Sequence, residues 1–162
     1  MEHYINITLA QIEASVGDIK NNAKKILEVW EAVDNRSHLV VFPELSLSGY
    51  PPEDLLLRLD FLKECKRQLE FIVSASKNFK SVGIIGTPFY DGDLYNSAVV
   101  IKGGSLLCVY HKHFLAFDEK RYFKRGKESV ILELNGTKIG LSICEDIWYP
   151  DGLAGVEVLV NI

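Results

Sequence analysis

The stretch Leu39-Val40-Val41-Phe42-Pro43-Glu44 shows most clearly which kind of fold the chain adopts. Four consecutive apolar residues, three of them β-branched or aromatic, are typical of a strand covered on both faces of its sheet. Active sites in open α/β sheets lie beyond the carboxyl ends of strands. Glu44 is therefore a candidate functional residue by position, although a solvated loop carboxylate is the simpler interpretation.

The segments on either side of this run predict alternating strands and helices. Apolar residues recur at helical spacing over 19–33 and 60–77, and Asp18 and Asp60 stand where N-caps are expected. The strands predicted in this half are 5–10, 38–42 and 82–86. The first half therefore has the order β-α-β-α-β, whose right-handed crossovers predict a sheet with helices on a face.

The second half of the chain is typical of hairpins. Two dipeptides, Gly103-Gly104 and Asn135-Gly136, each stand between two apolar runs and favour tight turns. The strands predicted around and after these turns are 97–102, 105–110, 130–134, 137–143 and 156–162. The sum is a mixed α/β domain.

Length, composition and charge narrow the class of protein. The 162 residues, 48% apolar and 25% charged, correspond to one globular domain. The net charge of −4 argues against a nucleic-acid partner held through its phosphates. No apolar run approaches the roughly 18 residues of a membrane span, so no membrane partner is expected.

The three cysteines, Cys65, Cys108 and Cys144, lack a CxxC spacing. They argue against a disulfide framework and favour a reducing cytoplasm. Cys144 follows an apolar strand at an expected strand-to-helix turn, where backbone N–H groups should lower its pKa and make it a nucleophile. Buried filler is the alternative for Cys144 and the preferred interpretation of the other two.

Lys112 stands at a third strand end, between His111 and His113. A lysine in a site can stabilise an oxyanion as a point charge, whereas the plain alternative is a surface lysine. The His-x-His spacing could place two imidazoles on one strand face. Without a third ligand nearby, no metal site is expected.

Four motifs in order give the chain a specific pattern. They span residues 42–55, 93–98, 117–123 and 140–148. The first contains Ser48-Gly49-Tyr50-Pro51-Pro52-Glu53-Asp54-Leu55. Together they resemble the nitrilase superfamily of carbon-nitrogen hydrolases and, more narrowly, the glutaminase domain of glutamine-dependent NAD synthetases. The resemblance covers essentially the whole chain.

This resemblance implies a fold and roles for matching residues. The implied fold is α/β, a nitrilase-like α-β-β-α sandwich that is C-terminally truncated in this chain. Glu44 corresponds to the general base, Lys112 to the cation at the oxyanion and Cys144 to the nucleophile. The supporting and substrate-binding positions are Glu119 for support and Tyr50 and Glu145 for the substrate.

The implied reaction is hydrolysis of the glutamine amide through a cysteine thioester. The ammonia would pass to a synthetase domain of the same parent chain, which uses ATP and Mg to amidate nicotinic acid adenine dinucleotide to NAD. Residues 1–162 are interpreted as the N-terminal part of the glutaminase domain, which needs no cofactor and no metal. The synthetase domain is expected to be absent, since no GxxxxGK[ST] motif occurs. A homo-oligomer is expected.

Two alternatives stay open. One is a stand-alone carbon-nitrogen hydrolase, an amidase that acts on another small amide. The other is an inactive fragment that serves as an assembly module, because groups that hold the glutamine would follow Ile162 in the family. The segment between Lys112 and Phe117 is also about four residues shorter than the family pattern. In the family this loop helps to line the substrate pocket, so part of the pocket wall is expected to differ.

Overall fold

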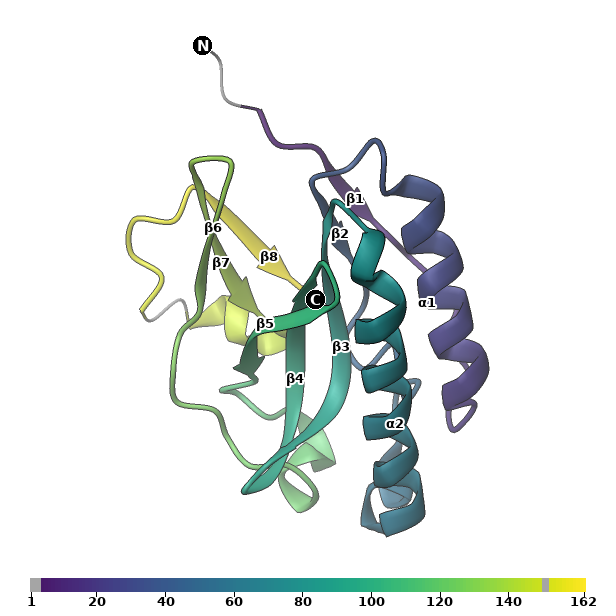
Figure 1. The fold of residues 1–162 in the computed structure, drawn as a ribbon. Helices are drawn as coiled ribbons and strands as arrows, with labels where there is room; N and C mark the ends of the chain where they lie inside the picture. Colours follow the sequence, from purple (N-terminus) through teal and green to yellow (C-terminus); the bar gives the residue numbers. More distant parts are fainter. Residues whose placement is uncertain (1–3, 150–151) are drawn as a thin grey trace.

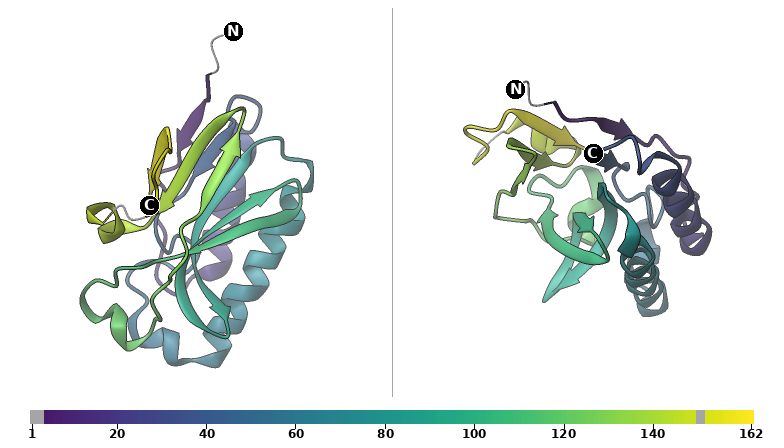
Figure 2. Two further views of the ribbon diagram at one scale, coloured as in Figure 1. Left: turned by 90° about the vertical axis from the view of Figure 1, so that its left-hand side faces the viewer. Right: turned by 45° about the horizontal axis from the view of Figure 1, so that its top comes forward.

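In the computed structural model, which describes residues 4–149 and 152–162, the chain is built in three layers (Figure 1). Two helices, α1 (Ile19–Val33) and α2 (Leu59–Ala75), lie side by side against a five-stranded sheet. A three-stranded sheet packs on the other face of that sheet, as Figure 1 and the right-hand view of Figure 2 show. The layers run α-β-β, in agreement with the expected fold class.

The first sheet has the strand order β1-β2-β3-β4-β5. Its strands are β1 (Ile7–Leu9), β2 (Leu39–Val41), β3 (Val82–Asp91), β4 (Asp93–Lys102) and β5 (Ser105–His111). The first three strands are parallel, and the remaining pairs are antiparallel. The predicted β-α-β-α-β half is thus confirmed, and each helix makes one crossover between neighbouring parallel strands.

The second sheet has the order β6-β7-β8, with strands β6 (Ile131–Leu134), β7 (Thr137–Ser142) and β8 (Val158–Asn161). Both predicted turns are confirmed. Asn135 and Gly136 have φ values of 53° and 79°, and Gly103 and Gly104 have 55° and 78°. Type I′ turns require positive φ at both central residues, a conformation that glycine and asparagine tolerate best.

Four short 3₁₀ helices complete the described chain. They are η1 (Glu53–Leu57), η2 (Ser76–Asn78), η3 (Phe117–Arg121) and η4 (Cys144–Trp148). The sequence pattern did not predict η1 or η3. Helices this short lack the repeated apolar spacing on which such a prediction depends.

Two apolar cores explain why the run 39–42 is uniformly apolar. Val40 and Phe42 pack in the core between the helices and the first sheet, whereas Leu39 and Val41 pack in the core between the sheets. Successive side chains of a strand point to opposite faces, so a strand with both faces covered needs apolar residues throughout.

Some predicted details are wrong. Helix α2 begins at Leu59 after Arg58, so Asp60 lies in its first turn and pairs with Arg58 instead of capping the helix. Asp18 does stand at the N-cap of α1, but its carboxylate accepts from Asn21 Nδ2 and makes no capping bond. Exposed acidic side chains have such local partners available, which residue type alone does not reveal.

Strand lengths also differ from the predictions. Strand β3 continues to Asp91, and β4 begins at Asp93, so a hairpin turns at Gly92. Its polar and exposed tip hides the strand pattern in the sequence. Neither helix of the described residues is long and apolar enough to cross a bilayer.

Candidate active site

Several strand ends meet at one edge of the two-sheet structure. Glu44 follows β2, and Lys112 follows β5. Asn96, near the start of β4, accepts a hydrogen bond at its main-chain oxygen from the Lys112 N–H at 2.8 Å. Cys144 follows β7, and its N–H donates to the Ile162 oxygen at the end of β8 at 2.8 Å. The topology thus brings together residues 68 positions apart, as expected for an α/β site.

The backbone that carries Glu44 is held tightly against β3. Leu45 has a φ of 50°, and Leu47 N–H donates to the Gly86 oxygen at 3.1 Å. A Cβ at Gly86 would lie 2.3 Å from Leu45 N and 2.4 Å from Pro43 O. Only glycine at this position of β3 lets the loop pass so closely, which fixes where the Glu44 side chain starts.

Lys112 is the centre of the site. Its Nζ donates to Glu44 Oε1 at 2.7 Å and to Glu119 Oε2 at 2.8 Å. The amide of Asn96 donates from Nδ2 to the same Glu44 Oε1 and to Glu119 Oε1, both at 2.7 Å. The lysine is only 1% exposed, so the interpretation as a surface lysine is wrong.

Burial and charge act in opposite directions within this cluster. Burial alone would lower the pKa of Lys112, but the carboxylates of Glu44 and Glu119 outweigh it and raise that pKa. Burial also raises the pKa of Glu44, although Lys112 opposes the change. The lysine is therefore firmly charged, while Glu44 is a carboxylate made more basic than an exposed glutamate. Such a group suits general base catalysis.

Cys144 lies close enough to the cluster for its charges to act on the thiol. Burial and the Glu44 charge raise the pKa of Cys144, while Lys112 opposes them. The prediction of a lowered pKa is therefore wrong. The element that starts at Cys144 is a five-residue 3₁₀ helix, too short for a strong dipole, and the carboxylates outweigh it. A nearby carboxylate of raised pKa is a group that could accept the proton of such a thiol.

Asp146 fixes the Cys144 turn to the segment after Lys112, a role that the sequence did not indicate. Its Oδ1 accepts from the N–H groups of His113 at 3.1 Å and Phe114 at 2.7 Å. Its Oδ2 accepts from Tyr110 OH at 2.8 Å and Ile143 N–H at 3.1 Å. Because the Asp146 carboxylate is buried and accepts four hydrogen bonds, it holds these two segments firmly together. Its position directly after Cys144-Glu145 was the available signal.

The segment of only four residues between Lys112 and Phe117 is well packed. Leu115 and Ala116 are buried, and the Phe114 ring stacks on Tyr149 at 4.0 Å between centroids. Ala116 N–H donates to Glu119 Oε2 at 2.7 Å, which helps to direct this carboxylate towards Lys112. The short segment therefore supports Glu119.

The predicted substrate-binding residues lie at the rim of the site. Tyr50 is half exposed and lines a cavity of about 220 Å³ together with Glu119 and Phe123. Burial, followed by the charges of Glu44 and Glu119, raises the pKa of the Tyr50 hydroxyl. Glu145 is half-buried next to Cys144 on η4. The structure thus places Tyr50 by the cluster and Glu145 beside the candidate nucleophile.

The remaining cysteines and the two histidines beside Lys112 lie in surroundings that indicate structural roles. Cys65 is buried on α2, and Cys108 is half-buried on β5. His111 Nδ1 shares a 2.7 Å hydrogen bond with Ser97 Oγ, whereas His113 Nε2 lies 3.2 Å from the Glu128 oxygen. The two imidazoles therefore have separate partners. Within residues 4–149 and 152–162, no three histidine, cysteine or acidic side chains form a group that could hold a metal ion.

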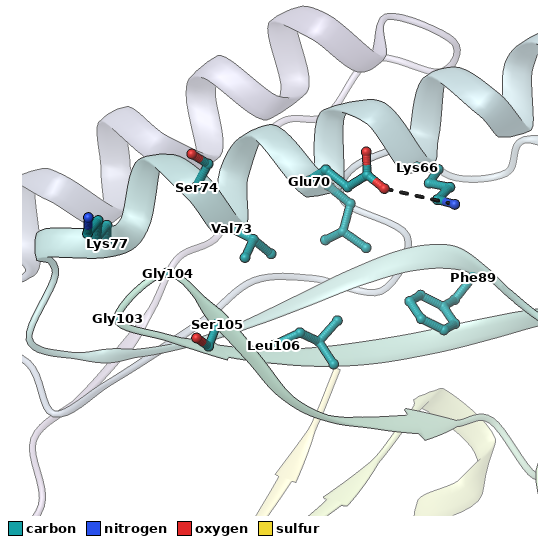
Figure 3. A pocket seen from close by; sticks show the side chains of 11 residues that line it. Lys66, Glu70, Val73, Ser74, Lys77, Phe89, Gly103, Gly104, Ser105 and Leu106 are labelled. Atoms are coloured by element: carbon teal, nitrogen blue, oxygen red, sulfur yellow. Dashed lines mark ion pairs between the residues drawn. The ribbon is translucent and has the colours of Figure 1, made fainter.

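A larger cavity, of about 660 Å³, lies elsewhere (Figure 3). It is between α2 and the turn at Gly103-Gly104, with Val73, Phe89 and Leu106 on its walls and the Lys66–Glu70 ion pair at its edge. None of its lining residues belongs to the cluster around Lys112. The cluster around Lys112 is therefore the candidate active site because of its buried charge and not because of its volume.

Comparison with known proteins gives one consistent result. The carbon-nitrogen hydrolase family profile matches residues 6–162. The chain is 49% identical over 168 residues to the glutamine-dependent NAD(+) synthetase of Aquifex aeolicus, a match that includes 98% of this chain and 30% of that protein. The chain thus spans less than a third of the length of this curated relative.

Solved structures agree. The glutamine-dependent NAD+ synthetase of Acinetobacter baumannii, solved with adenosine diphosphate, superposes with a TM-score of 0.85 at 33% identity, covering 98% of this chain and 32% of that one. An amidase of the nitrilase superfamily from Nesterenkonia also gives 0.85, at 19% identity, covering 98% and 64%. The second likeness concerns the fold alone and confirms the predicted fold class.

Proposed function

The chain belongs to the carbon-nitrogen hydrolase family, and we propose that it hydrolyses the side-chain amide of glutamine. The comparisons confirm the family membership and the resemblance to glutamine-dependent NAD synthetases that the four motifs indicate. The single observation that carries the proposal is the buried Glu44–Lys112–Glu119 cluster beside Cys144. It offers a base, a cation and a nucleophile at one edge of the fold.

The proposed first step forms a thioester. Glu44 accepts the proton of the Cys144 thiol, and the thiolate attacks the amide carbon of glutamine. Negative charge then develops on the amide oxygen. Lys112 has three N–H donors and uses two for Glu44 and Glu119, so the third is available to that oxygen.

The proposed second step releases glutamate. Glu44 returns the proton to the nitrogen, the carbon–nitrogen bond breaks, and ammonia leaves. Glu44 then takes a proton from water, whose oxygen attacks the thioester, and the sulfur of Cys144 leaves with a proton. A carboxylate made more basic by burial can do both tasks, since it must accept a proton and then give it back.

We propose further that the ammonia is used in the synthesis of NAD, the reaction for which the relatives are named. Those proteins are glutamine-dependent NAD(+) synthetases about three times as long as this chain. ATP and Mg would act in a synthetase part of the protein outside these residues, and glutamine and that part are the proposed partners. A cytoplasmic location and a homo-oligomer belong to the same proposal, and the three free cysteines are consistent with a reducing compartment.

The test measures glutamate and ammonia released from glutamine by the protein at its natural length. We expect activity that Cys144→Ala abolishes and that Cys108→Ala, which alters a half-buried strand cysteine, leaves intact. Retained hydrolysis in Cys144→Ala would rule out the proposed nucleophile. Hydrolysis of simple amides but not of glutamine would instead favour the stand-alone amidase.

A labelling experiment tests the assembly-module alternative. A glutamine-like electrophile should modify Cys144 stoichiometrically and spare Cys65, which is buried on α2. Failure to label Cys144 more readily than Cys108 would favour a structural role for the fragment.

A further inference from the structure

Asn96 is completely buried at the centre of the site, although no catalytic step described above uses it. Its Nδ2 donates to Glu44 and to Glu119, each at 2.7 Å. Its main-chain oxygen accepts from the Lys112 N–H. One residue therefore contacts all three charged members of the cluster, from a strand that pairs with β3 on one side and β5 on the other.

The orientation of the amide is fixed by its surroundings. Among the described residues, the buried Asn96 Oδ1 has no hydrogen-bond partner, whereas both hydrogens of Nδ2 face carboxylates. Turning the amide over would place its oxygen against two carboxylate oxygens and would remove two charge-assisted bonds. A buried polar atom without a partner costs free energy, so the two bonds made by Nδ2 must outweigh that cost.

The cluster needs such a donor because its charges do not balance. Two carboxylates share one ammonium group, so the ionised cluster has an excess negative charge on side chains that are only 1%, 10% and 14% exposed. Like charges in close contact favour protonation of one of them. A neutral N–H donor between the two carboxylates stabilises both ionised forms without adding charge.

We propose that Asn96 is a positioning residue that holds Glu44 and Glu119 side by side and favours the ionised form of Glu44, so that Glu44 can accept the proton of Cys144. This inference rests on the proposed function, since it assigns the role through Glu44. The bond from Asn96 lowers the pKa of Glu44 against the larger effect of burial, which agrees with this role. The charged and titratable groups that face Glu44 are Lys112, Glu119, Tyr50 and Cys144.

The test uses two variants in the protein at its natural length. Asn96→Leu keeps the branching of the side chain and removes the donor, and Asn96→Asp keeps the shape and adds a third carboxylate. We expect each to reduce kcat/KM for glutamine about 10- to 100-fold, mainly through kcat, because a hydrogen bond to a charged group is lost. The acid limb of the pH profile should move to higher pH, since Glu44 binds its proton more tightly.

Thr87→Val is the matched control. Thr87 is a fully buried polar residue on the neighbouring strand, and its hydroxyl donates to the Pro88 oxygen. This variant should lower the melting temperature without moving the acid limb. If Asn96→Leu and Asn96→Asp slow the reaction but leave the acid limb where it is in the unchanged protein, Asn96 is merely structural and the proposal is wrong.

The rate of Cys144 alkylation by iodoacetamide as a function of pH provides a readout that needs no turnover. In both Asn96 variants, the pH at which alkylation rises should increase. An unchanged profile would overturn the role of Asn96, even in a protein that hydrolyses glutamine. A protein that fails to hydrolyse glutamine but shows the shifted profile would overturn the proposed function and keep the role of Asn96.

Discussion

Two ion pairs in this molecule have the same length and very different surroundings. Lys112 Nζ lies 2.7 Å from Glu44, and Arg58 Nη2 lies 2.7 Å from Asp60. The side chains of the first pair are 1% and 14% exposed, and those of the second are 63% and 70% exposed. Water screens the exposed pair, whereas the buried pair depends on its protein partners.

The difference teaches that distance alone does not identify a functional pair. Arg58 and Asp60 are two residues apart at the start of α2, so their contact needs only the local backbone and no tertiary structure. Lys112 and Glu44 meet only because β2 and β5 end at the same edge of the fold. Substitutions at buried and at exposed charges should therefore differ widely in their effects.

The largest effect is expected for Lys112→Met. Removal of the ammonium leaves two half-buried carboxylates facing each other, which should lower the free energy of unfolding by about 3–5 kcal/mol and abolish the proposed glutamine hydrolysis. Urea denaturation measures the first effect. Lys24→Met breaks the exposed pair with Glu28 and should change stability by less than about 0.5 kcal/mol. Equal losses of unfolding free energy in the two variants would show that burial does not distinguish the two ion pairs.

Burial should also make the stability of the protein depend on pH, through the thiol of Cys65. Burial raises the pKa of the Cys65 thiol from 9.0 to about 12. Between these values the unfolded chain loses this proton and the folded chain keeps it, so the free energy of unfolding falls as pH rises. The loss attributable to Cys65 should reach about 4 kcal/mol near the upper value.

Cys65→Val should remove this part of the alkaline destabilisation, as judged by urea denaturation at pH 7, 9 and 11. Cys108→Val serves as the control because Cys108 is only half-buried, and it should flatten the profile less. A profile of Cys65→Val that is parallel to that of the unchanged protein would show that burial of this thiol does not govern the alkaline limb.

A smaller loss is expected for Asp146→Asn. The amide can accept from the N–H groups of His113 and Phe114, but its Nδ2 then opposes the Ile143 N–H, and Tyr110 OH must turn to accept from it. We expect a loss of about 3 kcal/mol by thermal or urea unfolding. Tyr110→Phe removes one of the four bonds and should cost about 1 kcal/mol. A larger loss for Tyr110→Phe than for Asp146→Asn would refute the role of the carboxylate.

The smallest effect is expected for Arg67→Ala, on the exposed face of α2. Arg67 makes a bidentate contact with Glu64, yet its side chain is largely exposed. The variant should change the free energy of unfolding by about 0.5 kcal/mol or less, and less still in high salt. A loss comparable to that of Lys112→Met would mean that geometry outweighs burial.

The sequence predicted much of the fold because its signals are local. The apolar spacing gave α1 at its observed bounds, and two turn dipeptides placed two hairpins. The hairpin at Gly92 and the helices η1 and η3 were missed, since exposed tips and single turns carry little periodicity. The helix cap assigned to Asp60 was wrong because a nearby arginine offered its carboxylate a partner.

The candidate site was predicted unevenly. The positions of Glu44, Lys112 and Cys144 at strand ends, together with the four motifs, singled out the three residues. The same reasoning gave the wrong direction for the pKa of Cys144, because it considered a helix end and not the carboxylates from other strands. It assigned no role to Asn96 or Asp146, whose partners lie on different elements.

By itself, the sequence determined the two long helices, most of the strands and two of the tight turns, and which side chains are available for chemistry. These properties follow from spacing and residue type along the chain. Only the tertiary structure decided that a lysine, two glutamates and an asparagine become buried neighbours. The physical reason is that burial and charge depend on distances through space, and parallel and antiparallel pairing brings distant strand ends together there.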